Sequence, residues 1–419
     1  MSFNEKRVVI TGLGVVSNIG LDVSSFWDSL MAGRSGIRPI TAFDASPYKT
    51  RIAGDVQGFS LPPHQSKRLE RFSQFAVSAA AQALAQAGLL REDALAQPGQ
   101  GGLAPDRVGV TVGTGIGGFP MLEEEHAKFL QRGAGKFHPL TVPIIIANMA
   151  AANVSLMFGL KGPNYCVTSA CATGNHSLGA GLDMIRAGRA DAVLAGGVES
   201  TLSPFALNGY IQLKALSTRN DDPAGASRPF SLGRDGFVLA EGGGVVVLES
   251  LDSAKARGVE ILAELAAVGM SSDAYHLTAP DPEGHGAVRA MSEALREAGI
   301  SPQQVSYINA HGTSTPLNDQ VETLAVKRVF GGAGQAPPIS SIKSMVGHSL
   351  GGAAGIEAVA SVMTLLKGVI PPTINLHEPD PELDLDYVPL KPREAKVDTV
   401  MSNAFGFGGH NAVSLFRRF

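Results

Sequence analysis

Cys171 is the residue of this sequence best placed to act as a nucleophile. It stands in TSACATGNHSLGAG (168–181), among small residues and at the point where an apolar helix is expected to begin. The free N–H groups and the dipole of a helix N-terminus favour a thiolate, and small neighbours leave room for a substrate. An unpaired cysteine is more often a buried core residue, as we expect for Cys166 in the apolar run NYCVTSA. Cys171 therefore needs partners before it can be interpreted as catalytic.

Two histidines in the second half of the chain are candidate partners. His311 ends the strand VSYINA and precedes Gly-Thr-Ser-Thr, while His348 lies in KSMVGHSLGG, at the position that parallels Cys171 in an internal repeat. A single loop histidine is usually a structural hydrogen-bonding residue. Two of them at repeat-equivalent turns facing a cysteine favour acid–base or electrostatic catalysis. Lys343 and Glu357 are candidates for a supporting charge network, with an ordinary helix or surface position as the alternative.

Short β-branched runs alternate with Ala/Leu-rich helical patterns along the whole chain, which is typical of an α/β protein with mostly parallel strands. The apolar strand runs are continuous, as expected when helices cover both faces of a sheet. Strands are expected at 7–14, 107–115, 190–200 and 243–250, and helices at 24–33 and 72–89.

The two halves of the chain resemble one another. Three pairs of segments occur in the same order: VVITGLGVVS with ILAELAAVGMSS, VGVTVGTGIGG with VSYINAHGTST, and CATGNHSLGAGLDMI with MVGHSLGGAAGIEAV. This pattern predicts a duplicated α/β unit, divided near the charged segment 251–260 into halves 1–256 and 257–419. The matching loops of both halves would then share one face, where an active site is expected.

Composition narrows the class of protein. The chain has 419 residues, 44% of them apolar, so it can bury a large core. A net charge of -4 gives no overall attraction for nucleic acid or an anionic membrane. Two cysteines and an N-terminus without a signal-peptide pattern favour a reducing cytoplasm. No apolar run reaches the roughly 18 to 20 residues that span a bilayer, so we expect no membrane segment.

Two other kinds of site are not favoured. Gly113, Gly115 and Gly118 form a GxGxxG pattern after a strand, but a charged helical segment follows, so a tight turn is preferred to a dinucleotide site. The ten histidines include no HExxH pair and no Cys/His ligand spacing, so no metal site is expected.

Six motifs together resemble those of the elongating β-ketoacyl-acyl-carrier-protein synthases, which are condensing enzymes of the thiolase superfamily. The resemblance covers essentially the whole chain. The motifs are VTSACATG, RPFSLGRDGFVLAEGGGVVVLE (228–249), SSDAYHLTAPDP (271–282), NAHGTSTPLND (309–319), SIKSMVGHSLGGAAG (341–355) and SNAFGFGGHN (402–411). The family more often has GFGGTN in the last of these, where this chain has His410.

The resemblance implies a duplicated thiolase fold, layered α-β-α-β-α with two mixed sheets. It also implies a decarboxylative Claisen condensation of an acyl thioester with malonyl-acyl carrier protein in fatty acid chain elongation. Cys171 would carry the acyl group, and His311 and His348 would stabilise the enolate as neutral donors. The N–H groups of Cys171 and Phe407 would form the oxyanion hole. Lys343 and Glu357 would organise the histidine pair.

The resemblance assigns further residues by their positions in these motifs. Phe407 would also gate the acyl chain, and Ile116 would limit the depth of the acyl pocket. Other substrate contacts would come from Phe405, Thr313 and Thr315, the two threonines holding the phosphopantetheine arm. A basic cluster would dock the acidic carrier protein, with a solvated charge cluster as the alternative: Lys67, Arg68, Arg71 and Lys214.

The expected assembly is a homodimer that uses acyl carrier protein as its partner. No cofactor of its own is expected, because the carrier protein bears the phosphopantetheine. A ketosynthase of a polyketide or specialised lipid pathway is the main alternative. A degradative thiolase would need a cysteine near the C-terminal glycine loop, and an initiating synthase would have Asn where His348 stands. A subunit without catalytic activity would lack Cys171, and a dinucleotide-dependent dehydrogenase remains a distant alternative.

Overall fold

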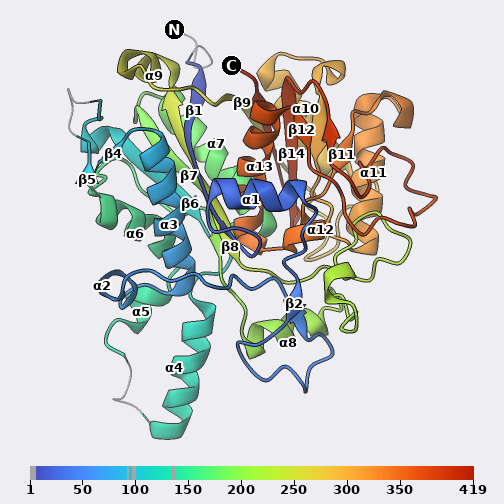
Figure 1. Ribbon diagram of the computed structural model, residues 1–419, viewed down its shortest axis with the longest axis horizontal. Coiled ribbons are helices and arrows are strands. Elements are labelled where there is room, and N and C mark those ends of the chain that lie inside the picture. The colour runs from blue at the N-terminus through green and yellow to red at the C-terminus, as the bar shows by residue number, and fades with distance from the viewer. Residues whose placement is uncertain (1–5, 92–93, 97–100, 134–137) are drawn as a thin grey trace.

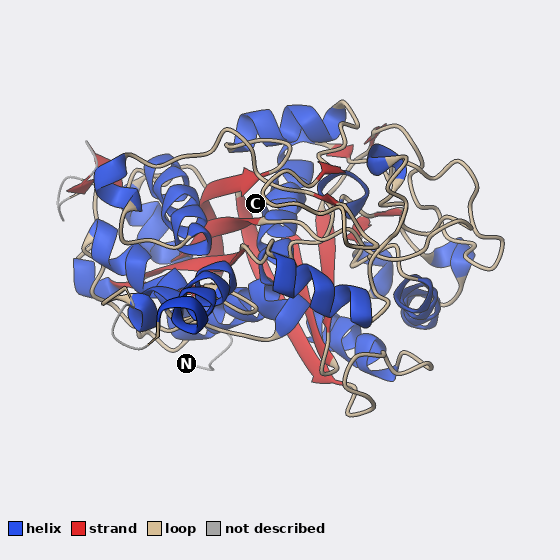
Figure 2. Ribbon diagram, turned by 90° about the horizontal axis from the view of Figure 1, so that it is seen from below, coloured by secondary structure: helices blue, strands red, loops and turns tan. Residues whose placement is uncertain are grey.

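Nine strands form one sheet that runs through the molecule in the order β11-β10-β14-β15-β9-β1-β8-β7-β6 (Figures 1 and 2). The computed structural model describes residues 6–91, 94–96, 101–133 and 138–419. The strands of this sheet are β1 (Val8–Ser17), β6 (Val108–Gly113), β7 (Ala192–Glu199), β8 (Gly242–Ser250), β9 (Ala263–Ser272), β10 (Tyr307–Asn309), β11 (Ile339–Ser340), β14 (Thr399–Gly406) and β15 (His410–Arg417).

The continuous apolar runs become strands that are covered on both faces. All ten residues of β1 are buried, as expected for a strand between two layers of helix. Two of its glycines let a helix approach very closely. A Cβ on Gly12 would lie 2.0 Å from the carbonyl oxygen of Ala83, and one on Gly14 would lie 1.9 Å from that of Ala79. Side chains at these positions would therefore push the helix away from the sheet.

Helices lie in three layers around the two halves of the sheet. The middle layer, packed between the halves, consists of α7 (Thr173–Arg186) and α13 (Ala353–Lys367). The outer layer of the first half is α3 (Arg71–Gln86) with α6 (Met149–Phe158), and that of the second half is α10 (His285–Ala298) with α11 (Pro316–Phe330) (Figure 1). The stretch Leu350–Lys367 is long and apolar enough to span a membrane, but 89% of it is buried inside the protein.

The remaining elements connect these layers. Among them α4 projects from the body of the molecule next to α5 (Figure 1). The connecting helices are α1 (Val23–Met31), α2 (Pro63–Ser66), α4 (Phe119–Arg132), α5 (Thr141–Ile145), α8 (Pro204–Gln212), α9 (Leu251–Arg257) and α12 (Lys343–Val346). The short strands are β2 (Arg38–Pro39), β3 (Ile52–Ala53), β4 (Leu90–Arg91), β5 (Ala94–Leu95), β12 (Val369–Ile370) and β13 (Arg393–Glu394).

The internal repeat appears in three dimensions as two copies of one topology. Elements β1, α3, β6, α7, β7 and β8 correspond in order to β9, α10, β10, α13, β14 and β15. In both copies the second strand pairs parallel with the third, as β6 does with β7 and β10 with β14. The predicted duplicated, layered α/β fold is confirmed.

One detail of the predicted architecture differs. The sequence analysis expects two mixed sheets, but β1 and β9 pair through Val9 with Glu264 and Ile10 with Ala263, which joins the halves into one sheet. Backbone pairing at the centre removes two strand edges that would otherwise need another cover. The division at residue 256 falls near the end of α9, just before the connection to β9. The division of the chain into halves 1–256 and 257–419 stays a prediction.

Candidate active site

Cys171 lies in a tight turn immediately before the middle-layer helix α7. The sequence analysis expects the helix to begin at this residue, but residues Ala170–Ala172 form a 3-10 turn and the α-helix begins at Thr173. Ala170 adopts a left-handed backbone with φ 49°, a conformation that stores strain in a residue with a side chain. The cysteine is 5% exposed and borders a cavity of about 370 Å³.

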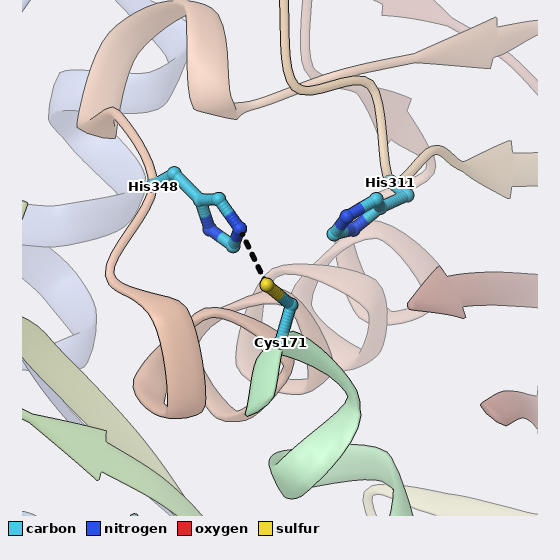
Figure 3. A group of neighbouring side chains, drawn as sticks. All are labelled: Cys171, His311 and His348. Carbon is cyan, nitrogen blue, oxygen red and sulfur yellow. Dashed lines mark hydrogen bonds between the residues drawn. The ribbon is translucent and has the colours of Figure 1, made fainter. Parts of the chain in front are cut away.

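The two histidines converge on this cysteine from separate loops. Figure 3 shows the Cys171 side chain pointing toward the space between the rings of His311 and His348. The Nε2 atom of His348 lies 3.0 Å from the Cys171 sulfur. The rings of His311 and His348 are 5.4 Å apart and nearly perpendicular, at 84°. The residues that the sequence analysis grouped by repeat position are therefore brought together by the fold.

The repeat position of His348 differs from the one expected. The 3-10 turn Leu350–Gly352 precedes α13 as Ala170–Ala172 precedes α7. Leu350 also has the left-handed φ of its counterpart Ala170, 48° against 49°. Gly351 is therefore the structural equivalent of Cys171, and His348 lies three residues earlier. This offset lets the histidine reach across to the cysteine instead of occupying the same place in the other half.

Burial determines the protonation of all three side chains. Desolvation raises the pKa of the Cys171 thiol to about 11, against the lowering effect of the Lys343 ammonium. The sequence analysis expected a helix N-terminus to favour the thiolate, but burial opposes the anion more strongly. Desolvation also lowers the pKa of His311 and His348 well below the ordinary value, and the Lys343 ammonium adds to this effect. The resting site therefore contains a thiol and two neutral imidazoles.

Lys343 and Glu357 form a buried ion pair whose ammonium acts on both histidines. The Lys343 ammonium contacts the Glu357 carboxylate, and both side chains are almost fully enclosed. Burial raises the pKa of Glu357 to about 7, while Lys343 lowers it. The second oxygen of Glu357, Oε2, has no hydrogen-bond partner among the described residues. The predicted charge network is thus placed where its positive charge acts on both rings.

The C-terminal glycine loop lies over Cys171. A Cβ on Gly406 would come within 3.1 Å of the Cys171 nitrogen, so a side chain here would be tightly packed, and glycine lets the loop approach without displacing its neighbour. The backbone N–H groups of Phe407 and Cys171 hydrogen bond toward the thiol and lower its pKa. Two backbone donors therefore face the Cys171 sulfur.

The cavity brings most of the predicted substrate residues together. Thr313, Thr315, Phe405 and Phe407 line it together with the cysteine and both histidines. The hydroxyl oxygens of Thr313 and Thr315 are 2.8 Å apart. Ile116 does not line this cavity and is 39% exposed, so a single chain does not place it in an acyl pocket.

The four predicted docking residues separate into two groups. Lys214, Lys67 and Arg68 are exposed. Lys214 lines the cavity of Cys171, whereas Lys67 lines a second cavity. Arg71 is not a free surface cation, because its guanidinium binds the buried Glu241 carboxylate, with Nη2 at 2.6 Å from Oε1. A charge so engaged has little left to offer to a partner.

Two buried acids near His311 were not singled out by the sequence analysis. The carboxylate of Glu322 accepts the backbone N–H groups of His311 at 2.8 Å and Gly312 at 2.7 Å. Asp319 accepts the Phe230 N–H at 2.9 Å, and burial raises its pKa to about 6. The two acids lie three residues apart, at helical spacing, in the first turns of α11, the helix that follows the His311 loop. That spacing after a candidate catalytic histidine is the signal that could have identified them.

Glu199 at the end of β7 was also not singled out. Its carboxylate accepts the Thr114 hydroxyl at 2.8 Å, the Gly115 N–H at 2.7 Å and the Gly351 N–H at 3.2 Å. Gly115 is the middle glycine of the GxGxxG pattern, so the N–H group of this turn binds the Glu199 carboxylate of the protein itself. Glu199 thereby joins the loop after β6 to the turn that follows His348.

Comparison with protein families gives matches over both halves of the chain. Residues 5–254 match the model described as Beta-ketoacyl synthase, N-terminal domain, and residues 262–377 match Beta-ketoacyl synthase, C-terminal domain. Proteins named 3-oxoacyl-[acyl-carrier-protein] synthase 2 are similar over their full length. The one from a Synechocystis species is 46% identical over 100% of this chain and 99% of its own, and the one from Coxiella burnetii is 47% identical over 99% of each.

Solved structures agree with these matches. A beta-ketoacyl synthase from Burkholderia phymatum superposes with a TM-score of 0.90 at 36% identity, covering 99% of this chain and 100% of that one. A type II polyketide ketosynthase in complex with its acyl carrier protein has a TM-score of 0.89 at 36% identity, covering 99% of each chain. The curated relatives share more of their sequence with this chain than these polyketide and synthase structures do.

Proposed function

The chain belongs to the beta-ketoacyl synthase family, and we infer that its cysteine and two histidines catalyse the decarboxylative condensation of an acyl thioester with malonyl-acyl carrier protein in fatty acid elongation. The observation that carries this assignment of residues is the convergence of Cys171, His311 and His348 at one cavity.

We propose that acyl loading couples proton transfer to attack. With a thiol pKa of about 11, almost no thiolate exists at neutral pH, so the proton must leave as the new bond forms. His348 Nε2, 3.0 Å from the sulfur, is placed to accept it. The Cys171 sulfur bonds to the acyl carbon, the bond from that carbon to the phosphopantetheine sulfur breaks, and the proton ends on the departing thiol. The N–H groups of Cys171 and Phe407 stabilise the oxyanion.

The second half-reaction uses the histidines as neutral donors. Malonyl carrier protein enters after the first carrier leaves, and its thioester oxygen lies between His311 and His348. Loss of CO2 places negative charge on that oxygen, which the two imidazole N–H groups stabilise. The enolate carbon attacks the acyl carbon on Cys171, and the bond from that carbon to the Cys171 sulfur breaks. This releases β-ketoacyl carrier protein and leaves a Cys171 thiolate, which takes a proton from solvent to restore the resting thiol. Neutral rings are required, and their low pKa values support this step.

The cavity mouth is the proposed entry for the phosphopantetheine arm. The neighbouring hydroxyls of Thr313 and Thr315 would hydrogen bond to its amides, and Phe405 would contact the reacting thioester. The exposed cations Lys67, Arg68 and Lys214 would attract the acidic carrier protein, with Arg71 ordering the segment near α2. The reaction needs no cofactor beyond the phosphopantetheine that the carrier protein bears. The reduced state of Cys171 that the chemistry requires supports a cytoplasmic location.

We also propose that the enzyme works as a homodimer. Residues 163–165 run alongside β6 at the edge of the sheet. They form backbone hydrogen bonds with Val110 of that strand on one side. Nearby apolar side chains are exposed on the single chain, including Ile116 at 39%, Tyr165 at 46% and Leu156 at 75%. An open strand edge flanked by apolar residues favours pairing with another chain. A second copy here would cover Ile116 and turn it into a wall of the acyl pocket.

Mass measurement of the intact protein after incubation with acyl carrier proteins tests these roles. Cys171→Ala should gain no acyl mass. His311→Ala should load normally but decarboxylate malonyl carrier protein about 10²- to 10⁴-fold more slowly, the usual effect of removing one electrostatic or acid–base group. A Cys166→Ala variant serves as the matched control and should behave as the wild type. Acyl mass on Cys171→Ala, or full decarboxylation by His311→Ala, would contradict the assignment.

A further inference from the structure

The three catalytic side chains also form a set of metal ligands. One ligand atom from each of Cys171, His311 and His348 lies within 4.8 Å of the other two, and all three residues are buried (Figure 3). The sequence predicts no metal site, because it has no HExxH pair and no Cys/His ligands at the short spacings typical of such sites. Here the ligands come from three loops that only the fold brings together.

The chemistry of this set suits a thiophilic divalent cation. Thiolate sulfur and neutral imidazole nitrogen are the preferred ligands of Zn²⁺, at about 2.3 Å and about 2.0–2.1 Å in tetrahedral geometry. Such bond lengths separate ligand atoms by roughly 3.3–3.6 Å. The His348 nitrogen and the Cys171 sulfur are 3.0 Å apart, so they need to open by about half an ångström while His311 moves inward. Side-chain rotations can supply shifts of this size.

A buried ion pair balances the charge beside the ligand set. The Lys343 ammonium acts on both histidines, and the Glu357 side chain pairs with it. The lysine therefore adds little net positive charge against a bound cation. The Cys171 thiol has to lose its proton when a metal binds.

We propose that Cys171, His311 and His348 bind one Zn²⁺ ion in competition with acyl transfer, making the catalytic site a reversible inhibitory site for thiophilic divalent cations. The cation displaces the thiol proton to solvent and is held by the sulfur and one nitrogen of each ring. The cavity of about 370 Å³ provides the entry route and leaves the fourth coordination position open to water. An ion there removes the nucleophile and both enolate donors at once.

Cobalt spectroscopy tests the site without any turnover. The metal-free full-length protein is titrated with Co²⁺, and a near-ultraviolet thiolate-to-cobalt charge-transfer band is expected to saturate at one equivalent. Added Zn²⁺ should abolish the band by displacing the cobalt. Cys171→Ser should lack the band, while Cys166→Ala, which changes the other cysteine, should retain it. No band in the wild type, or an undiminished band in Cys171→Ser, would overturn the proposal.

The histidine ligands are tested by affinity. His311→Ala and His348→Ala should each weaken cobalt binding at least tenfold, because each removes one of three ligands. Unchanged affinity in both variants would mean that the thiol alone binds the metal, which contradicts a three-ligand site. In the wild type, Zn²⁺ should also block acyl loading of Cys171, a chelator should restore it, and Mg²⁺ at the same concentration should have no effect. Cobalt binding with unimpaired loading would refute the inhibitory part of the proposal.

Discussion

Burial keeps each of the three active-site side chains uncharged. It raises the pKa of the Cys171 thiol to about 11 and lowers the pKa of both histidines. The thiol is therefore a poor nucleophile at rest, which protects it from unwanted reactions, while the histidines are ready to donate hydrogen bonds. A more exposed site would give the opposite balance, with a more reactive sulfur and rings that protonate in mildly acidic solution.

The decarboxylation rate is expected to be insensitive to acid over the range in which ordinary histidine titrates. A lowered pKa means that the neutral ring persists to lower pH, so the rate should stay constant from about pH 8 to about pH 6.5 and below. Lys343→Met removes the ammonium that lowers both pKa values, so its acidic limb should move to higher pH. Rates of CO2 release from malonyl carrier protein measure both profiles. A wild-type rate already halved near pH 6.5 would contradict this account.

At the scale of elements, short turns before two helices set the geometry of the site. Each turn contains a residue with left-handed φ, Ala170 or Leu350, and each leads into a helix of the middle layer. Glu199 joins the second turn to the loop after β6, and glycines make this close approach possible. A Cβ on Gly351 would lie 2.2 Å from the Gly115 nitrogen. The carboxylate thus links the loop that carries Ile116 to the turn that follows His348.

Glu199→Gln should change the pH dependence of stability in a defined direction. Burial raises the pKa of Glu199 to about 7, so the protonated form stabilises the fold. This stabilisation is fully present below the pKa of Glu199 in the unfolded chain, near 4.5. It is lost as the pH rises through the pKa of about 7 in the folded chain. Over this pH range the free energy of unfolding of the wild type therefore falls by up to about 3 kcal/mol. The neutral glutamine of Glu199→Gln causes no such fall.

Thermal melts at about pH 5 and about pH 8 measure this effect. The Tm of Glu199→Gln relative to the wild type should rise between the two values, whatever the cost of the substitution itself. The exposed Glu260→Gln provides the matched control, with no such change in relative Tm. A relative Tm of Glu199→Gln that falls with pH would show that this carboxyl group is not held in its neutral form.

At the scale of the whole molecule, the sheet has an uncovered edge in the first half. Central strands are protected by neighbours and by helices, and β1 and β9 close the seam between the halves. The segment next to β6 has no such neighbour within the described residues. Ile116 is exposed in a single chain, although the family resemblance places it at the acyl pocket. The second copy proposed at this edge would cover it.

Tyr165→Glu should convert the proposed dimer into a monomer. Tyr165 is 46% exposed on the open edge, so a second copy paired there would bring two new carboxylates close together. Light scattering at micromolar concentration measures the mass in solution. Leu277→Glu, at a 78% exposed position on the loop beside the glycine loop, should leave the mass unchanged. A monomeric wild type, or a dimer that tolerates Tyr165→Glu, would contradict the interface.

The sequence by itself was sufficient to predict the fold class and the duplication. It also singled out Cys171, His311 and His348, which the fold brings together at one cavity. Strands and helices are predicted from the local spacing of apolar residues, and this spacing can be found in the sequence alone. The same holds for the repeat, which preserved the order of β1, β6 and α7 in β9, β10 and α13. The motifs around Cys171, His311 and His348 carried the family resemblance.

Only the tertiary structure decided the protonation states and the partners at longer range. The helix-start argument for a Cys171 thiolate failed because burial is a property of all surrounding layers, not of one turn. Arg71 pairs with Glu241, Glu199 accepts the Gly351 N–H, and side-chain atoms of Cys171, His311 and His348 lie within 4.8 Å of one another, although these residues are far apart in the chain. Such contacts depend on how loops from both halves meet in space, and local sequence patterns do not give the distances between residues that are far apart in the chain.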